Sequence, residues 1–328
     1  MSTINLIAWN NGFGLTRNLQ LLQGVLTEAG HVVTLSPLRR GKLRKVFRPA
    51  LLRGRVALQR LCLRETAKYD INIMLEHVRP EYFPMAHRNV LMPHPEWFIE
   101  SDRVGLDGID QVFALTRHAV PIFEQLGKPV RYTGFTSEDR LDRGVPRERA
   151  FFHLAGRSSN KGTARLLALW HRHPEWPLLT VVQNPRAVKE LASAANIDHH
   201  VDYLPDTELK RLQNSHRFHL CPSETEGFGH YLVEAMGIGA AVVTVDAPPM
   251  NEMISDDRGL RVQIAETGTQ NLATTYFFDE ASMEAAVARL LGAEDAELDR
   301  LSVAARDWYE QNDRAFRAQL VEAVAALT

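Results

Sequence analysis

The stretch Cys221–Met250, CPSETEGFGHYLVEAMGIGAAVVTVDAPPM, constrains the fold more than any other part of the chain. An apolar strand pattern ends before a Gly-Phe-Gly turn, a helical pattern begins near His230, and an apolar β-branched run closes at Val245. Strand, glycine turn, helix and strand in this order are typical of a parallel α/β sheet. Gly227 and Gly229 lack a Cβ atom, so we expect them to adopt φ > 0 and to let a ligand approach the backbone, where the helix N-terminus attracts an anion.

The same alternation of strand and helix patterns runs through all 328 residues and divides them into two domains. The first strand pattern of the second domain is Phe151–Leu154, and the charged segment before it, Thr136–Arg149, is the predicted linker. Alternating strands and helices predict parallel sheets with helices on both faces. In the second domain we also expect two helices, over Pro185–Ala195 and over Asp206–Asn214, the latter with Asp206 as its N-cap.

Composition and length of the apolar runs favour a soluble protein. Hydrophobic residues make up 45% and charged residues 24% of the chain, which is ordinary for a globular fold. We find no apolar run of membrane-spanning length and no signal-peptide pattern at the N-terminus. The two cysteines, Cys62 and Cys221, form no pairing framework, which fits a reducing compartment. We therefore expect a cytoplasmic protein.

A net charge of −2 conceals a strongly basic segment in the first domain. Leu38–Arg64 contains ten Arg or Lys residues and no acid, with apolar residues such as Leu51, Val56 and Leu61 between them. One interpretation is an element that docks on an anionic membrane, which places the protein peripherally on the inner face. The alternative is a solvated helix face. Nucleic acid is the least favoured partner, because basic charge alone does not specify it.

The N-terminal loop Asn10–Asn18, NNGFGLTRN, looks at first like a dinucleotide fingerprint. It contains Gly12 and Gly14, but Arg17 occupies the third glycine position. The next strand pattern ends at Ser36 without an acidic residue for a ribose. These departures exclude the nicotinamide dinucleotide site that the fingerprint normally marks.

Two carboxylates, Glu226 and Glu234, are separated by seven residues around the glycine turn. Together with the turn and the helix they resemble the E-x7-E donor-binding signature of nucleotide-sugar-dependent glycosyltransferases with the GT-B fold, most closely the retaining family 4. The resemblance covers Phe151–Ile254 well and the first domain only in layout. It implies two Rossmann-like, doubly wound parallel-sheet domains that face a cleft. They are an acceptor-side domain over residues 1–140 and a nucleotide-sugar-binding domain over 150–305, with a last helix over 306–328 that crosses back to the first.

The resemblance also implies roles for single residues. Glu226 accepts hydrogen bonds from the sugar and Glu234 from the ribose diol, while Arg157 and Lys161 stabilise the departing diphosphate. His77, which ends a strand pattern of the first domain, lies near the transferred sugar. The remaining donor contacts come from glycine turns and nearby backbone, at Gly12, Gly14, Tyr203, Leu204, Gly227, Phe228, Gly229 and His230.

The implied reaction moves a sugar from a UDP- or GDP-linked donor to an acceptor hydroxyl, with retention of the anomeric configuration. Assembly of a polysaccharide, a lipopolysaccharide or a glycolipid is the expected context. The chain contains no Asp-x-Asp pair, so neither a metal nor another cofactor is expected. Three alternatives stay open: another GT-B enzyme of activated sugars, such as an epimerase or a phosphorylase, a transferase acting on DNA bases, and a non-catalytic sugar-nucleotide-binding protein.

Overall fold

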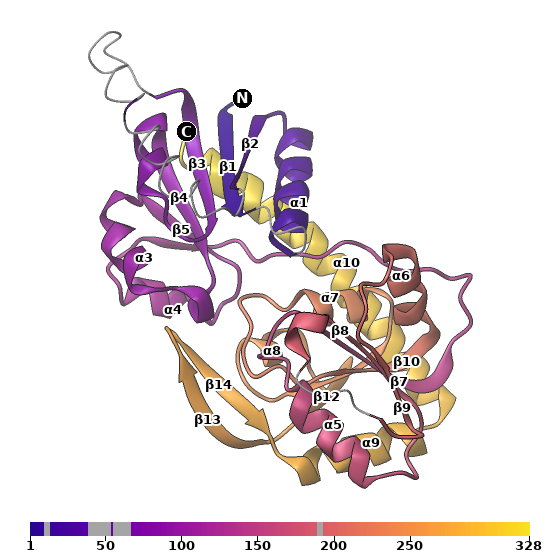
Figure 1. The fold of residues 1–328 in the computed structure, drawn as a ribbon. Coiled ribbons are helices and arrows are strands. Elements are labelled where there is room, and N and C mark those ends of the chain that lie inside the picture. Colours follow the sequence, from indigo (N-terminus) through magenta and orange to yellow (C-terminus); the bar gives the residue numbers. More distant parts are fainter. Residues whose placement is uncertain (10–13, 39–53, 55–66, 189–192) are drawn as a thin grey trace. The chain divides into compact units, whose positions relative to one another are not determined.

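The structure, a computed structural model, describes residues 1–9, 14–38, 54, 67–188 and 193–328. Gly12 lies outside the described residues. So does the basic segment Leu38–Arg64, except for its residues 38 and 54. The chain forms two compact units (Figure 1). Unit 1 comprises residues 1–135 and 314–328, and unit 2 comprises residues 136–313.

Unit 1 is built on a six-stranded parallel sheet with the order β2-β1-β3-β4-β5-β6. Aliphatic side chains of its central strands, such as Ile4 and Ile73, are completely buried, as is Leu22 of the first helix. The strand order reverses between β1 and β3, and ligands of α/β sheets bind at the carboxyl ends of the strands at such a point. The elements are β1 (Thr3–Trp9), α1 (Gly14–Glu28), β2 (Val32–Leu38), β3 (Tyr69–Glu76), β4 (Ala86–Pro93), α3 (Glu100–Gly105), β5 (Gln111–Ala114), α4 (Ala119–Glu124) and β6 (Val130–Tyr132).

Unit 2 contains a second six-stranded parallel sheet, with the order β12-β11-β10-β7-β8-β9. This is the Rossmann order, and its switch point lies between β7 and β10. An antiparallel hairpin of β13 and β14 forms a separate two-stranded sheet in unit 2. The elements are β7 (Glu148–Gly156), α5 (Thr163–Arg172), β8 (Leu179–Gln183), β9 (Ile197–His200), α6 (Asp206–Ser215), β10 (His216–Cys221), α7 (His230–Gly237), β11 (Ala241–Val245), α8 (Met250–Met253), β12 (Gly259–Val262), β13 (Ile264–Gln270), β14 (Ala273–Phe278) and α9 (Glu280–Gly292).

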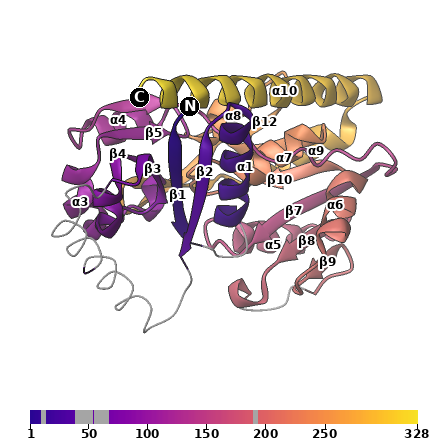
Figure 2. The same cartoon turned by 90° about the horizontal axis from the view of Figure 1, so that it is seen from above.

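Helix α10 (Asp295–Ala325) contributes to both units, because the division between them falls at Arg314. Figure 2 shows it as one continuous helix that ends at the C-terminus. Most of the segment 306–328, which is predicted to cross back to the first domain, belongs to this helix. In unit 1 its Phe316 ring packs against that of Phe135, with 4.9 Å between the ring centroids. No helix among the described residues is long and apolar enough to cross a bilayer.

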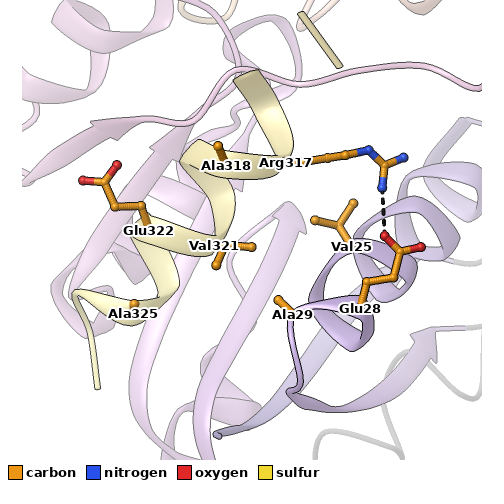
Figure 3. Close-up of a pocket in the computed structure, with 8 residues that line it drawn as sticks. All are labelled: Val25, Glu28, Ala29, Arg317, Ala318, Val321, Glu322 and Ala325. Atoms are coloured by element: carbon orange, nitrogen blue, oxygen red, sulfur yellow. Dashed lines mark hydrogen bonds and ion pairs between the residues drawn. The ribbon is translucent and has the colours of Figure 1, made fainter. Parts of the chain in front are cut away.

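A shallow groove of about 450 Å³ lies between α1 and the C-terminal part of α10 in unit 1 (Figure 3). An ion pair of 3.1 Å between Glu28 and Arg317 joins the two helices. The other lining residues are mostly small or apolar, among them Val25, Ala29, Ala318 and Val321. None of the residues that line this groove is a predicted site residue.

Three details of the expected second domain are wrong. The described residues of Pro185–Ala195 contain a 3-10 turn at Pro185–Ala187 in place of an α-helix, because the chain is already extended at Val188. Asp206 does not cap α6, since Pro205 is the N-cap and the Asp206 carboxylate instead accepts from Arg140. Of the two glycines in the signature turn, Gly229 has φ 103 whereas Gly227 does not have a positive φ.

Candidate functional site

Two loops of unit 2 meet where the strand order reverses. The first follows β7 and runs from Arg157 to Gly162, and the second follows β10 and carries Pro222–Gly229 into α7. Gly162 has φ 65, and a Cβ atom at this position would lie 2.4 Å from the carbonyl oxygen of Pro222. Glycine is therefore required at 162, because any side chain would push the two loops apart.

Lys161 and Glu226, one from each loop, form an ion pair. The Lys161 ammonium also lies 3.7 Å from the centre of the Tyr231 ring, a cation–π contact. Glu226 Oε1 accepts a second hydrogen bond, of 2.5 Å, from Ser223 Oγ, and the same Oγ lies 2.5 Å from the Tyr231 hydroxyl. The side chains of Lys161 and Glu226 remain 14% and 12% exposed, so a ligand can still reach the pair.

The sequence pattern does not reveal Ser223 and Tyr231 as members of this site. Tyr231 is buried and looks like a core residue of an apolar helix, while Ser223 looks like an ordinary turn residue. Burial raises the pKa of the Tyr231 hydroxyl well above its usual range, so the group stays neutral and acts as a hydrogen-bonding partner. The available signal was their placement on either side of Glu226.

Helix α7 begins directly at the glycine turn. Its N-cap Gly229 has φ 103, and a Cβ atom there would lie 2.9 Å from Leu232 Cδ1, so glycine is required. The first turn of α7 contains no acidic residue, which leaves the positive end of the helix available to an anion. Glu234 lies one turn further on and is buried, and its Oε2 accepts a 2.9 Å hydrogen bond from Gln213 Nε2.

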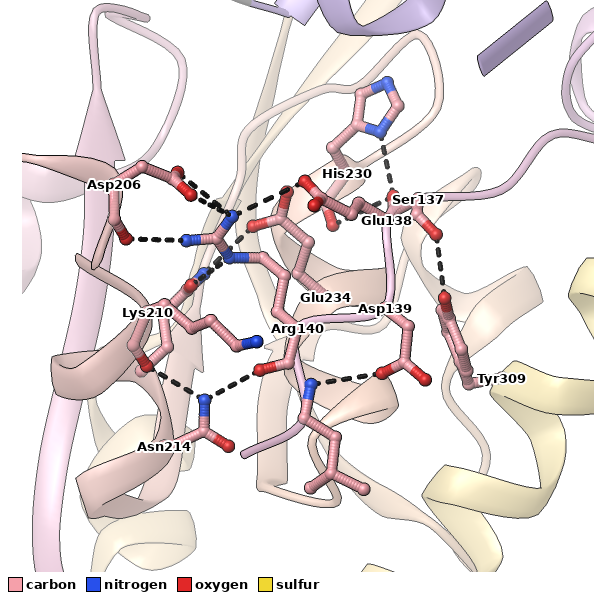
Figure 4. A network of polar contacts seen from close by, with 12 residues as sticks. Ser137, Glu138, Asp139, Arg140, Asp206, Lys210, Asn214, His230, Glu234 and Tyr309 are labelled. Carbon is pink, nitrogen blue, oxygen red and sulfur yellow. Dashed lines mark hydrogen bonds and ion pairs between the residues drawn. The ribbon is translucent and has the colours of Figure 1, made fainter. Parts of the chain in front are cut away.

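The other predicted donor residues of unit 2 differ in their exposure and in the residues that they contact. Arg157 is exposed in the same loop as Lys161. Tyr203 is 72% exposed, and Leu204 packs against the apolar cluster that contains Phe152 and Leu212. Two further predicted residues, Phe228 and His230, form an edge-to-face ring pair at 5.2 Å, and His230 Nδ1 lies 2.8 Å from Ser137 Oγ (Figure 4).

In unit 1, His77 follows β3 at the switch point of the sheet. Its Nδ1 lies 2.8 Å from Asp102 Oδ2, and because a carboxylate only accepts, this nitrogen carries the proton. Asp102 also accepts from the backbone N–H groups of Val78 and Ile99, so its own position is fixed. The sequence gives no signal for Asp102, which looks like an ordinary acid in a first helical turn. Gly14, also predicted, is the first residue of α1.

The hairpin of β13 and β14, which the sequence pattern does not predict, packs on both loops of the site in unit 2. The side chain of Asn160, next to Lys161, donates a 2.9 Å hydrogen bond to Gln270 Oε1. The backbone N–H of Tyr276 donates to the carbonyl of Glu224 at 2.7 Å. The hairpin therefore supports the backbone that carries the Lys161–Glu226 pair.

Two buried titratable groups near the switch point are structural. His153 joins β7 to β10 through a 2.8 Å contact between its Nδ1 and the carbonyl of Leu220, and burial lowers its pKa to about 4. The ring is therefore neutral near pH 7. Burial likewise raises the pKa of the Cys221 thiol, so this cysteine is not a thiolate nucleophile.

The family described as "Glycosyl transferases group 1" matches residues 126–308, which is more than half of the chain and includes both loops and α7. An uncharacterized glycosyltransferase of Haemophilus influenzae strain Rd is 31% identical over 98 residues. That match covers 28% of this chain and 28% of the relative, so the chain matches little more than a quarter of the relative's length.

Solved structures with the same fold cover nearly the whole chain. HepE of Anabaena in complex with UDP and glucose has a TM-score of 0.70 at 14% identity, covering 99% of this chain and 100% of that one. Sucrose-phosphate synthase of Thermosynechococcus elongatus has a TM-score of 0.70 at 15% identity, covering 100% and 99%. The lipopolysaccharide outer core galactosyltransferase WaaB has a TM-score of 0.68 at 13% identity, covering 99% of this chain and 99% of that one. The chain therefore has the two-domain α/β GT-B fold and belongs to the glycosyl transferases group 1 family.

Proposed function

We propose that this protein is a retaining, metal-independent glycosyltransferase of the family 4 type, with a UDP- or GDP-linked sugar as donor. The observation that carries the proposal is the contact between Lys161 and Glu226 at the N-terminal end of α7, with Glu234 one turn further along that helix. A cation, a helix N-terminus and two separate carboxylates match the diphosphate, the sugar and the ribose of one donor. Solved structures of the same fold that contain UDP with glucose, or UDP-glucose, support this donor class.

In the proposed reaction, the bond between the anomeric carbon and the β-phosphate oxygen breaks while the acceptor oxygen bonds to that carbon on the same face. The acceptor proton moves to a phosphate oxygen of the leaving group, so no separate enzymatic nucleophile is needed. Lys161, Arg157 and the α7 N-terminus stabilise the developing diphosphate charge. Glu226 binds the sugar hydroxyls, Glu234 the ribose, and the backbone at Tyr203–Leu204 the nucleobase.

His77 of unit 1 is assigned to the transferred sugar. Its Nδ1–H is held by Asp102, and its Nε2 lies 3.7 Å from Glu76 Oε2. Such a fixed ring orients a hydrogen bond to a sugar hydroxyl more sharply than a freely rotating ring would. A polysaccharide, lipopolysaccharide or glycolipid precursor is the proposed acceptor class.

The test of the proposed function is a thermal-shift screen of UDP, GDP, ADP and their sugars, followed by product analysis with acceptors. A bound ligand stabilises the fold by RT ln(1 + [L]/Kd), so the matching nucleotide raises Tm most. Transfer to an oligosaccharide or lipid acceptor supports the proposal. Conversion of the donor alone indicates an epimerase, consumption of phosphate a phosphorylase, glycosylated DNA a base transferase, and binding without turnover a non-catalytic protein.

Activity is expected to survive EDTA. The chain lacks an Asp-x-Asp pair, and Lys161, Arg157 and the α7 N-terminus supply the positive charge that a divalent cation would otherwise provide. Steady-state rates with and without excess EDTA, after dialysis against chelator, measure this directly. Loss of activity that Mg²⁺ or Mn²⁺ restores would show that the reaction depends on a metal.

Peripheral binding to an anionic membrane is proposed for the basic segment Leu38–Arg64. Its ten cations are expected to hold the protein on anionic vesicles at low salt, since each Lys or Arg near such a surface contributes about 1 kcal/mol. Release is expected at high salt because the Debye length shrinks. Flotation with anionic and neutral vesicles measures this, with a variant in which Arg39, Arg40, Lys42, Arg44 and Lys45 are replaced by Ser as the comparison. Equal binding to both vesicle types would indicate a solvated segment.

A further inference from the structure

Arg140 is a fully charged side chain buried inside unit 2, at 1% exposure. Its Nε donates a 2.5 Å hydrogen bond to Gln213 Oε1. Its terminal nitrogens donate to the carboxylate and the backbone carbonyl of Asp206, as Figure 4 shows. A buried guanidinium is costly unless its N–H groups are paired. These contacts show that the cation is held in a built network.

The orientation of the Gln213 amide follows from this contact. A guanidinium can only donate, so the amide oxygen of Gln213 must face Arg140. The amide nitrogen then faces Glu234 Oε2, to which it donates at 2.9 Å. In the opposite orientation, two donors would meet at Arg140 and two acceptors would meet at Glu234. Arg140 and Glu234, one on each side of the amide, therefore together fix Gln213 so that its nitrogen donates to the carboxylate.

Further hydrogen bonds join the segment that carries Arg140 to helices α6, α7 and α10 of unit 2. Asn214, beside Gln213 on α6, donates to the carbonyl of Arg140 and accepts from the N–H of Asp142, both at 2.8 Å. Ser137 Oγ contacts His230, the first residue of α7, at 2.8 Å. Asp139 pairs with Arg306. The hydrogen bond from the Arg306 guanidinium holds the pKa of the Asp139 carboxyl below its usual range.

We infer that Arg140, in the segment 137–142 near the start of unit 2, is a positioning residue that fixes the Glu234 carboxylate of the donor site through Gln213. The inference rests on the proposed function, in which Glu234 binds the ribose diol. Gln213 and Arg140 do not touch the donor. They set the rotation of the carboxylate, and so determine how strongly the protein distinguishes a ribose from a sugar without the two hydroxyls.

The experiment compares each of UDP, GDP and ADP with its 2′,3′-dideoxy counterpart by titration calorimetry. The quantity of interest is the ratio of the two Kd values for the nucleotide that binds. A wild-type ratio of roughly 10 to 100 is expected, the size of hydrogen bonds to a charged group. Gln213→Met, which keeps the volume but removes the donor, is expected to lower this ratio to about 3 or less while the dideoxy nucleotide binds as before.

Two further variants test the network without relying on one substitution. Gln213→Glu places a second carboxylate against Glu234 and is expected to lower the ratio as well. Arg140→Lys keeps a donor toward Gln213, so its ratio of the two Kd values is expected to stay close to that of the wild type. Asn196→Ala is the matched control, because Asn196 is also a buried amide of unit 2 but donates to the carbonyl of His173 at 2.8 Å, away from Glu234. It is expected to lower Tm and leave the ratio unchanged.

The outcomes separate this inference from the proposed function. A folded Gln213→Met or Gln213→Glu protein with the wild-type ratio would overturn the role of Gln213 and Arg140. An equal loss of the ratio in Asn196→Ala would assign the effect to general destabilisation and overturn it too. A wild-type protein that binds a nucleoside diphosphate but ignores its ribose hydroxyls would overturn the inference and the role of Glu234 together. A protein that binds no nucleotide would refute the proposed function itself.

Discussion

Lys161→Ala is expected to lower kcat by about 100-fold or more. In the proposed reaction Lys161 lies where negative charge develops on the leaving diphosphate, and removing one preorganised group from such a position costs about 2.7–4 kcal/mol of transition-state stabilisation. The fold is expected to survive, because Glu226 keeps its hydrogen bond from Ser223 when the ammonium is lost. Steady-state release of the nucleoside diphosphate measures the effect.

The control for this variant is Arg289→Ala, which also removes a cation from an ion pair of unit 2. Arg289 pairs with Glu297 at 3.2 Å on the exposed surface of α9 and α10, where such pairs contribute little. Its kcat is expected to stay within about twofold of wild type, since it lies outside the proposed site. Turnover of Lys161→Ala at the wild-type rate would remove Lys161 from the catalytic machinery.

The two carboxylates of the signature are expected to respond in opposite directions to the same amide substitution. Glu234→Gln should weaken binding of the free nucleoside diphosphate by about tenfold or more, because hydrogen bonds from the ribose to a charged group contribute about 1.5–3 kcal/mol. Glu226→Gln should instead tighten it, since the Glu226 carboxylate competes with the phosphates for Lys161. Calorimetric titration of both variants measures the two shifts.

Transfer by Glu226→Gln should nevertheless be slower than wild type, because the variant loses the charged acceptor for the sugar hydroxyls. Tighter nucleotide binding together with slower turnover is a combination that simple destabilisation of the fold does not produce. If both variants bind the free nucleotide equally well, Glu226 and Glu234 do not divide the sugar and the ribose between them. If Glu226→Gln binds it more weakly, the ion pair with Lys161 does not oppose the donor.

The local order of strand, glycine turn and helix in Cys221–Met250 was predictable from the sequence, because period, glycine placement and β-branched runs are properties of neighbouring residues. Both parallel sheets follow from the same kind of pattern. Glu226 and Glu234 were identifiable because both lie within this one short segment. The hairpin of β13 and β14 gave a weaker signal, since its mostly polar alternation around Asn271 resembles a loop.

Partners far apart in the chain were decided by the tertiary structure alone. Lys161 meets Glu226 across 65 residues, because the strand order brings β7 beside β10 and places the loops that follow them together. Arg140 meets Gln213 across 73 residues, because the segment before β7 is hydrogen-bonded to the end of α6. Strand order is not encoded in hydrophobic periodicity, which reports which face of an element is buried but not which element covers it. The sequence by itself thus determined the family resemblance and the two carboxylates. The fold decided which cation, amide and hydroxyl hold them, because only packing brings those side chains within hydrogen-bonding distance.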